Sequence, residues 1–181
     1  MVAGSPRLET ERLVLRRWDL DADLDPFAAM CADPEVMRYI GDGSTQTRAQ
    51  CADRLFAFEA VWRERGMGLF ATELTTAGEM IGFAGLAIPD FLPEIMPSVE
   101  IGWRLARAHW GQGYATEAAR AVLEYGFERV GLDRIVSVHA VGNEASANVM
   151  RKIGMHFERE TTHPVNGRGV RVYEIARSAT G

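Results

Sequence analysis

The sequence contains little cysteine and no long hydrophobic segment. Cys31 and Cys51 are the two cysteines among 181 residues, and neither belongs to a C-x-x-C pair or a cluster with histidine. Both lie in apolar, helix-forming stretches, so we expect buried free thiols. No apolar run approaches the length that spans a membrane, and the first residues lack the apolar core of a signal peptide. We therefore expect a cytoplasmic protein without a membrane partner.

A basic excess is also absent. The net charge is −5 at pH 7 and the isoelectric point is about 5.4. Such a chain is unsuited to bulk nucleic-acid binding, so we expect no nucleic-acid partner, whereas a cationic or amine-bearing substrate suits it. No metal-ligand spacing connects the four histidines, which are His109, His139, His156 and His163. We expect surface or loop histidines and no metal ion.

What is present describes one soluble globular domain. Hydrophobic residues make up 47% of the chain and charged residues 25%, which is ordinary for a folded protein. At 181 residues the chain is long enough for a full hydrophobic core. We expect a single domain over residues 1–181, with frayed ends at 1–6 and 178–181.

Helical and alternating hydrophobic patterns follow one another along the chain. Thr47 and Gln50 predict a capping box for a helix that runs to Arg65 and ends at Gly66. Other helices are expected at 26–32, 116–129 and 143–153, and strands at 13–18, 67–74, 80–88, 98–107, 134–141, 155–162 and 170–176. Because hairpin-linked strands run antiparallel and strands flanking a crossover helix run parallel, this order predicts an α/β (α+β) fold. Its sheet is mixed, twisted, mostly antiparallel and seven-stranded, with helices on both faces.

Two features between the predicted strands leave alternatives open. Gly82 and Gly85 interrupt a strand and indicate either a bulge or the close approach of another backbone. The proline-rich segment 89–97 carries several apolar side chains, which suit either a lid over a substrate site or packing against the sheet. Tyr39 and Phe91 are undecided between a pocket and the core, and we expect Trp62 in the core.

A glycine-punctuated turn, WGQGYATE, separates the strand at 98–107 from the helix that follows. Gly111 and Gly113 allow backbone conformations closed to other residues, and the helix start directs free N–H groups into the same loop. The turn is therefore either a tight connection or a cradle for phosphate. It is not a dinucleotide fingerprint, because Thr116 stands where the third glycine belongs and Asp133 precedes the next strand.

The run WGQGYATEAA resembles motif A of the GNAT acyl-CoA-dependent N-acetyltransferases. Three further segments resemble the ribosomal-protein N-acetyltransferase branch of that family: LETERLVLRRW from Leu8, DPEVMRYIG from Asp33 and NEASANVMRKIGM from Asn143. The motifs occur in family order over nearly the whole chain. The resemblance implies the GNAT fold, in which the strand before motif A splays away from the strand after the helix.

The resemblance also implies acetyl-CoA as co-substrate. Loop amides of Gln112, Gly113, Tyr114 and Ala115 would hold the pyrophosphate, and the backbone from Trp103 to Leu105 would pair with pantetheine in the opening between the splayed strands. The full set that the resemblance implies for the cofactor is Trp103, Arg104, Leu105, Trp110, Gly111, Gln112, Gly113, Tyr114, Ala115, Thr116 and Asn143. Capping of the adjoining helices would by itself justify the last two.

Two residues are candidates for the proton transfers. Glu100 lies on the face of its strand opposite the apolar row and is a candidate general base, although a solvated carboxylate or an ion pair with Arg104 is equally compatible. Many GNAT enzymes use a tyrosine as general acid where this chain has Met150. Ser146 is the substitute that the ribosomal-protein branch suggests, and the alternative is a residue that supports the cap at Asn143.

These residues favour an acetyl-CoA-dependent N-acetyltransferase. We expect a primary amine to attack directly in a ternary complex, with a protein N-terminal α-amine favoured as acceptor and a small amine next. The replacement of the usual tyrosine by Met150 motivates the alternative of a non-catalytic acyl-CoA-binding module. Exposed edges of the last strand pair make a homodimer plausible.

Overall fold

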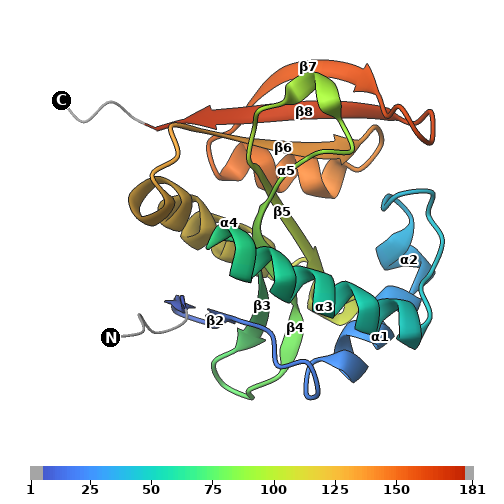
Figure 1. The fold of residues 1–181 in the computed structure, drawn as a ribbon, viewed down its shortest axis with the longest axis vertical. Helices are drawn as coiled ribbons and strands as arrows, with labels where there is room; N and C mark the ends of the chain where they lie inside the picture. Colours follow the sequence, from blue (N-terminus) through green and yellow to red (C-terminus); the bar gives the residue numbers. More distant parts are fainter. Residues whose placement is uncertain (1–5, 178–181) are drawn as a thin grey trace.

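The structure is a computed structural model that describes residues 6–177. Its strands form one sheet in the order β1-β2-β3-β4-β5-β6-β8-β7 (Figure 1). They are β1 (Leu8–Glu9), β2 (Leu13–Arg16), β3 (Leu69–Leu74), β4 (Met80–Ala87), β5 (Glu100–Leu105), β6 (Arg134–Ala140), β7 (His156–Thr162) and β8 (Gly169–Ala176). The helices are α1 (Leu24–Ala32), α2 (Pro34–Met37), α3 (Arg48–Arg65), α4 (Tyr114–Tyr125) and α5 (Glu144–Lys152). Short 3₁₀ turns lie at Pro93–Ile95 and Arg107–His109, and a π-helical turn at Gly126–Val130 prolongs α4.

The expected fold class is confirmed, with two additions. The described part of the sheet has eight strands instead of seven, because Leu8 and Glu9 pair with Leu15 and Val14 across a turn. A two-residue strand carries no periodic pattern from which it could be predicted. The second addition is α2, which begins at Pro34 with Asp33 as its N-cap. Of the residues expected to fray, only Pro6 lies within the described part, outside any helix or strand.

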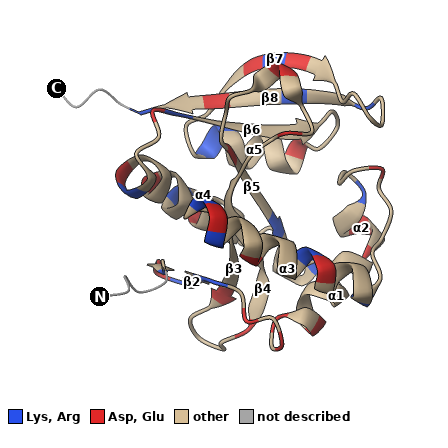
Figure 2. Ribbon diagram, in the orientation of Figure 1, with Lys and Arg blue, Asp and Glu red and all other residues tan. Residues whose placement is uncertain are grey.

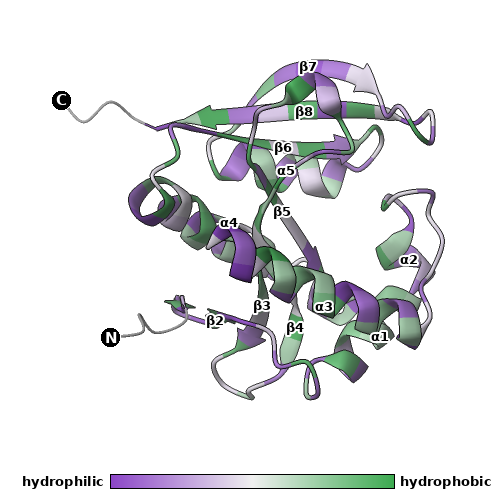
Figure 3. Ribbon diagram, in the orientation of Figure 1, coloured by the Kyte–Doolittle hydropathy of each residue, from purple (hydrophilic) through white to green (hydrophobic). Residues whose placement is uncertain are grey.

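Helices cover both faces of the sheet. Phe70 and Ala71 are successive in β3 and belong to different hydrophobic clusters, as alternation along a strand requires. The cluster around Phe70 includes the apolar face of α4, and the cluster around Ala71 includes α1, α2 and the first half of α3. Between the two, β4 is hydrophobic along nearly its whole length (Figure 3). Trp62 is buried in the first cluster, as expected.

The predicted capping box of α3 and the glycine that ends the α4 segment are confirmed, whereas α1 and α4 each begin two residues before their predicted starts. Thr47 and Gln50 form the capping box of α3, and Gly66 ends that helix in the left-handed conformation. Gly131 has a φ of 80° directly after the π-helical turn, so it ends the α4 segment as expected. Positive and negative side chains are interspersed along α3 (Figure 2), as on a solvated helix face.

The proline-rich segment packs against the sheet. Leu92 and Ile95 are buried with side chains of β6 and β8, and Phe91 stacks on His163 at 5.4 Å between ring centroids. These contacts favour core packing over the lid that the sequence left open. Both cysteines are buried free thiols, as expected.

Candidate active site

The neighbouring strands β5 and β6 run parallel but separate after one rung of their ladder. Glu100 is paired with Val136, and the Val136 amide donates to the Val99 carbonyl oxygen at 2.9 Å. The next rung of a regular parallel ladder would join the Val138 amide to the Ile101 carbonyl oxygen. Instead, the Val138 amide and the Ile101 carbonyl oxygen are each hydrogen-bonded to a side chain.

Those side chains belong to Ser137 and Glu100. The Ser137 hydroxyl donates to the Ile101 carbonyl oxygen at 2.8 Å, and the Val138 amide donates to Glu100 Oε1 at 3.2 Å. The two strands therefore part at this point without leaving either backbone group unpaired. We call this place the fork, defined by Glu100, Ile101, Ser137 and Val138.

Burial at the fork changes the acidity of Glu100. It raises the pKa of the carboxyl from about 4.5 to about 8, and the hydrogen bond from the Val138 amide opposes the rise only in part. Within residues 6–177 the carboxylate forms no ion pair with Arg104, and its bond from the Val138 amide gives it a structural role at the fork. A raised pKa is also what a general base near neutral pH requires.

The raised pKa has a consequence for stability that is independent of activity. The folded chain holds the Glu100 proton more tightly than the unfolded chain, so the free energy of unfolding falls as pH rises from about 4.5 to about 8 and is level above. In Glu100→Gln we expect this contribution to disappear, so that its free energy of unfolding falls less over the same pH range. Urea unfolding of both proteins across that range measures it, and parallel stability curves would contradict the burial of a titrating carboxyl.

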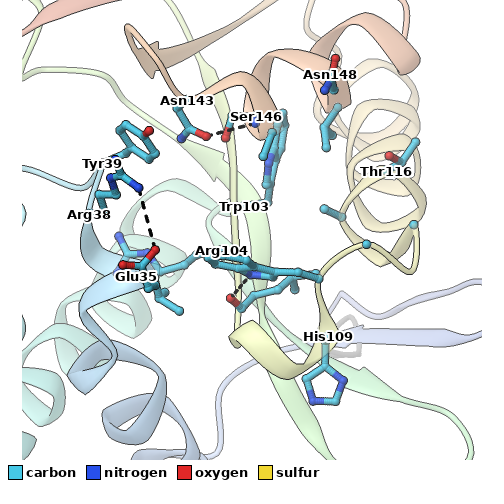
Figure 4. A pocket seen from close by; sticks show the side chains of 18 of the residues that line it. Glu35, Arg38, Tyr39, Trp103, Arg104, His109, Thr116, Asn143, Ser146 and Asn148 are labelled. Atoms are coloured by element: carbon cyan, nitrogen blue, oxygen red, sulfur yellow. Dashed lines mark hydrogen bonds and ion pairs between the residues drawn. The ribbon is translucent and has the colours of Figure 1, made fainter.

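A cavity of about 420 Å³ lies between α2 and α5. The end of β5, from Trp103 to Leu105, contributes to its wall, and the glycine turn and the first turn of α4 border one end. Figure 4 shows Asn143, Ser146 and Asn148 projecting from α5 and its cap on one side, with Glu35, Arg38 and Tyr39 on the other. Tyr39 is thus a cavity residue.

The glycine turn has the backbone that its sequence predicts. Gly111 and Gly113 have φ values of 73° and 84°, and α4 begins at the next residue. A Cβ at Gly113 would lie 3.4 Å from Arg12 Nη2, whereas one at Gly111 would meet no atom within 4 Å. The Trp110 indole donates to the Leu105 carbonyl oxygen at 2.8 Å, which fixes the turn to the end of β5.

The structure brings most of the expected cofactor residues to this cavity. Those among its lining are Trp103, Arg104, Leu105, Trp110, Gly111, Gly113, Ala115, Thr116 and Asn143. Gln112 and Tyr114 belong to the same turn but not to the lining. The Gln112 side-chain amide donates to the Ala108 carbonyl oxygen, and the Tyr114 ring lies beneath the Arg12 guanidinium. Their expected contribution is through backbone amides, which these positions allow.

The two candidates for proton transfer differ in position. Ser146 lines the cavity, and its backbone amide donates to Asn143 Oδ1 at 3.3 Å, so Asn143 caps α5 as expected. Glu100 is at the fork, outside the cavity lining. Met150, which replaces the usual tyrosine, is buried in the core.

A brace behind the glycine turn was not foreseen from the sequence. Glu117, in the first turn of α4, accepts from the Thr10 hydroxyl at 2.6 Å and from Arg12 Nε at 2.7 Å. Arg12 also donates to the Gln112 carbonyl oxygen at 3.0 Å. These bonds tie the N-terminal segment to the loop and the helix start, and the only sequence signal for them was the resemblance of LETERLVLRRW.

A connection that we call the roof joins the segment after α2 to the turn between β7 and β8. After α2 the chain passes through Gly41 and Asp42 toward the turn between β7 and β8 (Figure 1). Asn166 Nδ2 donates to the Gly41 carbonyl oxygen at 2.9 Å, and Arg168 donates to the carbonyl oxygens of Arg38 and Asp42 at 3.1 and 2.9 Å. Arg38 also lines the cavity, so these three bonds lie next to the cavity wall that α2 and the residues after it form.

One histidine expectation is wrong. His139 is buried in β6, where its Nδ1 lies 2.9 Å from the Ala140 carbonyl oxygen and burial lowers its pKa. His139 follows Ile135 and Ser137 on one buried face of β6. The sequence pattern did not distinguish this position from an exposed one. Over residues 6–177 no cluster of three metal-binding side chains occurs. No helix in that range is long and apolar enough to cross a membrane.

Comparison with known proteins agrees with this geometry. Residues 12–156 match the model of the family described as an acetyltransferase (GNAT) domain. An uncharacterized N-acetyltransferase of Bacillus subtilis, YoaA, is 33% identical over 155 residues, which cover 86% of this chain and 84% of that protein. The crystal structure of an acetyltransferase from Agrobacterium tumefaciens superposes with a TM-score of 0.80 at 29% identity, covering 98% of each chain.

The fold, with β5 and β6 separating in the middle of the sheet, and the family match indicate an acyltransferase. The chain belongs to the GNAT acetyltransferase family. A ribosomal protein L7/L12 N-acetyltransferase in complex with coenzyme A shares the fold at 14% identity, with a TM-score of 0.78 and coverage of 94% of this chain and 98% of that one. GNAT enzymes use acetyl-CoA and an amine acceptor, so this chain is an acyltransferase of that class.

Proposed function

We propose that this chain is a single-domain cytoplasmic enzyme that transfers the acetyl group of acetyl-CoA to a primary amine, with an α-amine favoured, by direct attack in a ternary complex. The observation that carries the proposal is the fork, where β5 and β6 separate, together with the cavity bordered by the glycine turn. An α-amino group has a pKa of about 8, against about 10.4 for lysine. An α-ammonium therefore needs less help from a base, and Glu100, whose pKa is raised by burial, is the proposed base.

The residues present fit the co-substrate. Gly111 and Gly113 hold the turn in conformations that leave its amides free to bind pyrophosphate, and the positive end of α4 lies beside them. The β5 edge from Trp103 to Leu105 would bind the pantetheine arm where β6 has separated. When bound, acetyl-CoA supplies an activated thioester and a good leaving group. Glu100, directly or through water, accepts the proton of the attacking amine.

Ser146 is proposed to protonate the leaving thiolate. Because a thiolate leaves readily without a proton, we expect Ser146→Ala to lower kcat by only about tenfold while the affinity for coenzyme A stays the same. The control is Thr76→Ala, which removes a hydroxyl from the exposed β3–β4 hairpin. Stopped-flow thiol release measures the effect. Equal kcat in both variants would leave Ser146 as a support of the Asn143 cap alone.

Two acceptor classes are proposed for different reasons. The resemblance to the ribosomal-protein branch favours a protein N-terminus. A small amine is the second class, and the cavity of about 420 Å³ has room for one. Thiol release from acetyl-CoA with N-terminal peptides, amino acids, polyamines and aminoglycosides separates the two.

The kinetic pattern tests the mechanism. Direct attack in a ternary complex predicts intersecting double-reciprocal plots, and a covalent acetyl-enzyme would give parallel ones. Coenzyme A binding without thiol release on any amine would instead favour the non-catalytic acyl-CoA-binding module. For a homodimer, light scattering of the purified protein is the measurement.

A further inference from the structure

Arg104 is a charged side chain in the cavity wall that lacks a charged partner. Its Nη1 lies 3.7 Å from Cys31 Sγ and 3.5 Å from Met37 Sδ, and its guanidinium lies over the Phe83 ring at 5.2 Å. Its Nε is buried and has no hydrogen-bond partner. Within residues 6–177 no carboxylate forms an ion pair with it. A partly buried guanidinium is thus surrounded by sulfur and an aromatic ring, which are weak partners.

Burying the charged Arg104 guanidinium costs free energy unless an anion pairs with it. It lowers the pKa of the guanidinium, because the charged form loses hydration, and it raises the pKa of the neighbouring Cys51 thiol to about 11. The Cys51 thiol is therefore neutral and offers no counter-charge. Retaining an arginine here needs an anion that is absent from the chain itself.

The position of Arg104 relative to Glu100 shows where that anion would come from. Glu100, Gly102 and Arg104 alternate along β5 and so share one face. A Cβ at Gly102 would meet no atom within 4 Å, so the face of β5 is open at the position between the two residues. Four residues of extended strand span about 13 Å.

We infer that Arg104 binds an anionic group of the acceptor, and that the acceptor is a small amine carrying a carboxylate. The inference rests on the proposed function, since it requires that the amine approaches Glu100. The ammonium lies toward Glu100, the carboxylate forms charge-assisted hydrogen bonds with Arg104, and the molecule lies over Gly102.

The wild-type protein tests this without any substitution. A series from glycine through β-alanine and 4-aminobutanoate to 5-aminopentanoate is compared with the corresponding carboxamides. We expect kcat/KM to be roughly tenfold to a hundredfold higher for the carboxylates, with a maximum at one chain length. Equal values for carboxylate and carboxamide, or a C-terminally amidated neutral peptide that surpasses every member of the series, would overturn the inference.

Substitution of the arginine locates the effect. In Arg104→Met the preference for the carboxylate should shrink to less than about threefold, whereas Arg104→Lys, which keeps the charge, should retain part of it. Coenzyme A affinity and a thermal melt show whether each variant is folded. If Arg104→Met does not fold, the Lys variant and the wild-type series carry the test. A full preference in a folded Met variant contradicts the assignment.

A binding measurement separates this inference from the proposed function. Calorimetric titration of 5-aminopentanoate and its carboxamide into the protein saturated with coenzyme A needs no turnover. Tighter binding of the carboxylate, lost in Arg104→Met, supports the anion site even if no thiol is released from acetyl-CoA. Thiol release with neutral amines and no preference for the carboxylate upholds the transferase and removes the anion site.

Discussion

Replacing Glu100 by glutamine is expected to lower kcat/KM for the acceptor on the order of a hundredfold or more at pH 8. Glutamine keeps the size of the side chain and retains an oxygen that can accept from the Val138 amide, so the fork is preserved. What is lost is the group that accepts the proton of the attacking amine. Thiol release at saturating acetyl-CoA, with the α-amine acceptor varied, measures the effect.

The pH profile distinguishes a lost base from a disturbed fold. A general base works in its deprotonated form, so the wild-type rate should rise with pH and level off above the Glu100 pKa of about 8. In Glu100→Gln that inflection should disappear, leaving only the deprotonation of free acceptor. Ser137→Ala is the structural control, because it removes the other side chain of the fork without removing a titrating group. An unchanged inflection in Glu100→Gln would assign the titration to another group.

The sequence predicted those parts of the site that depend on local backbone chemistry. The turn around Gly111 and Gly113, the start of α4 and the cap at Asn143 all follow from residue types at short spacing, and each is present. The face of β5 that carries Glu100 and Arg104 followed from alternation alone. Local patterns therefore placed most cavity residues on the correct elements.

The remainder depends on contacts between distant positions, for which one sequence holds no signal. The brace joins Thr10 and Arg12 to Glu117 across more than 100 residues, and the roof joins Gly41 to Asn166 across 125. At the fork, the Glu100 carboxylate accepts from the Val138 amide in place of the backbone carbonyl that a regular parallel ladder would supply. The alternating sequence pattern gives no sign of this interruption. The suspected ion pair between Glu100 and Arg104 is absent for the same reason, since Arg104 turns toward α1 and α2.

Gly82→Ala is expected to produce the largest loss of stability. Gly82 has a φ of 151°, and a Cβ there would lie 2.1 Å from the Arg104 carbonyl oxygen and 2.7 Å from Leu105 Cα. Both alternatives left open by the sequence are present here, because a register shift in the β3–β4 ladder also leaves Ile81 as an extra residue beside Gly82. Because both atoms are backbone, no side-chain rotation relieves the clash. We expect a free energy of unfolding lower by about 3 kcal/mol or more, and a Tm lower by about 6 °C or more.

The matched control is Gly102→Ala on the neighbouring strand. A Cβ at Gly102 meets nothing within 4 Å, so its free energy of unfolding should change by at most about 1 kcal/mol. Urea denaturation of both variants gives the comparison, and equal stability would show that β4 and β5 can separate at no cost. Since the clash is with the backbone of Arg104 and Leu105, any Gly82→Ala protein that still folds must displace the end of β5. That end forms part of the cavity wall, so coenzyme A affinity should fall together with stability.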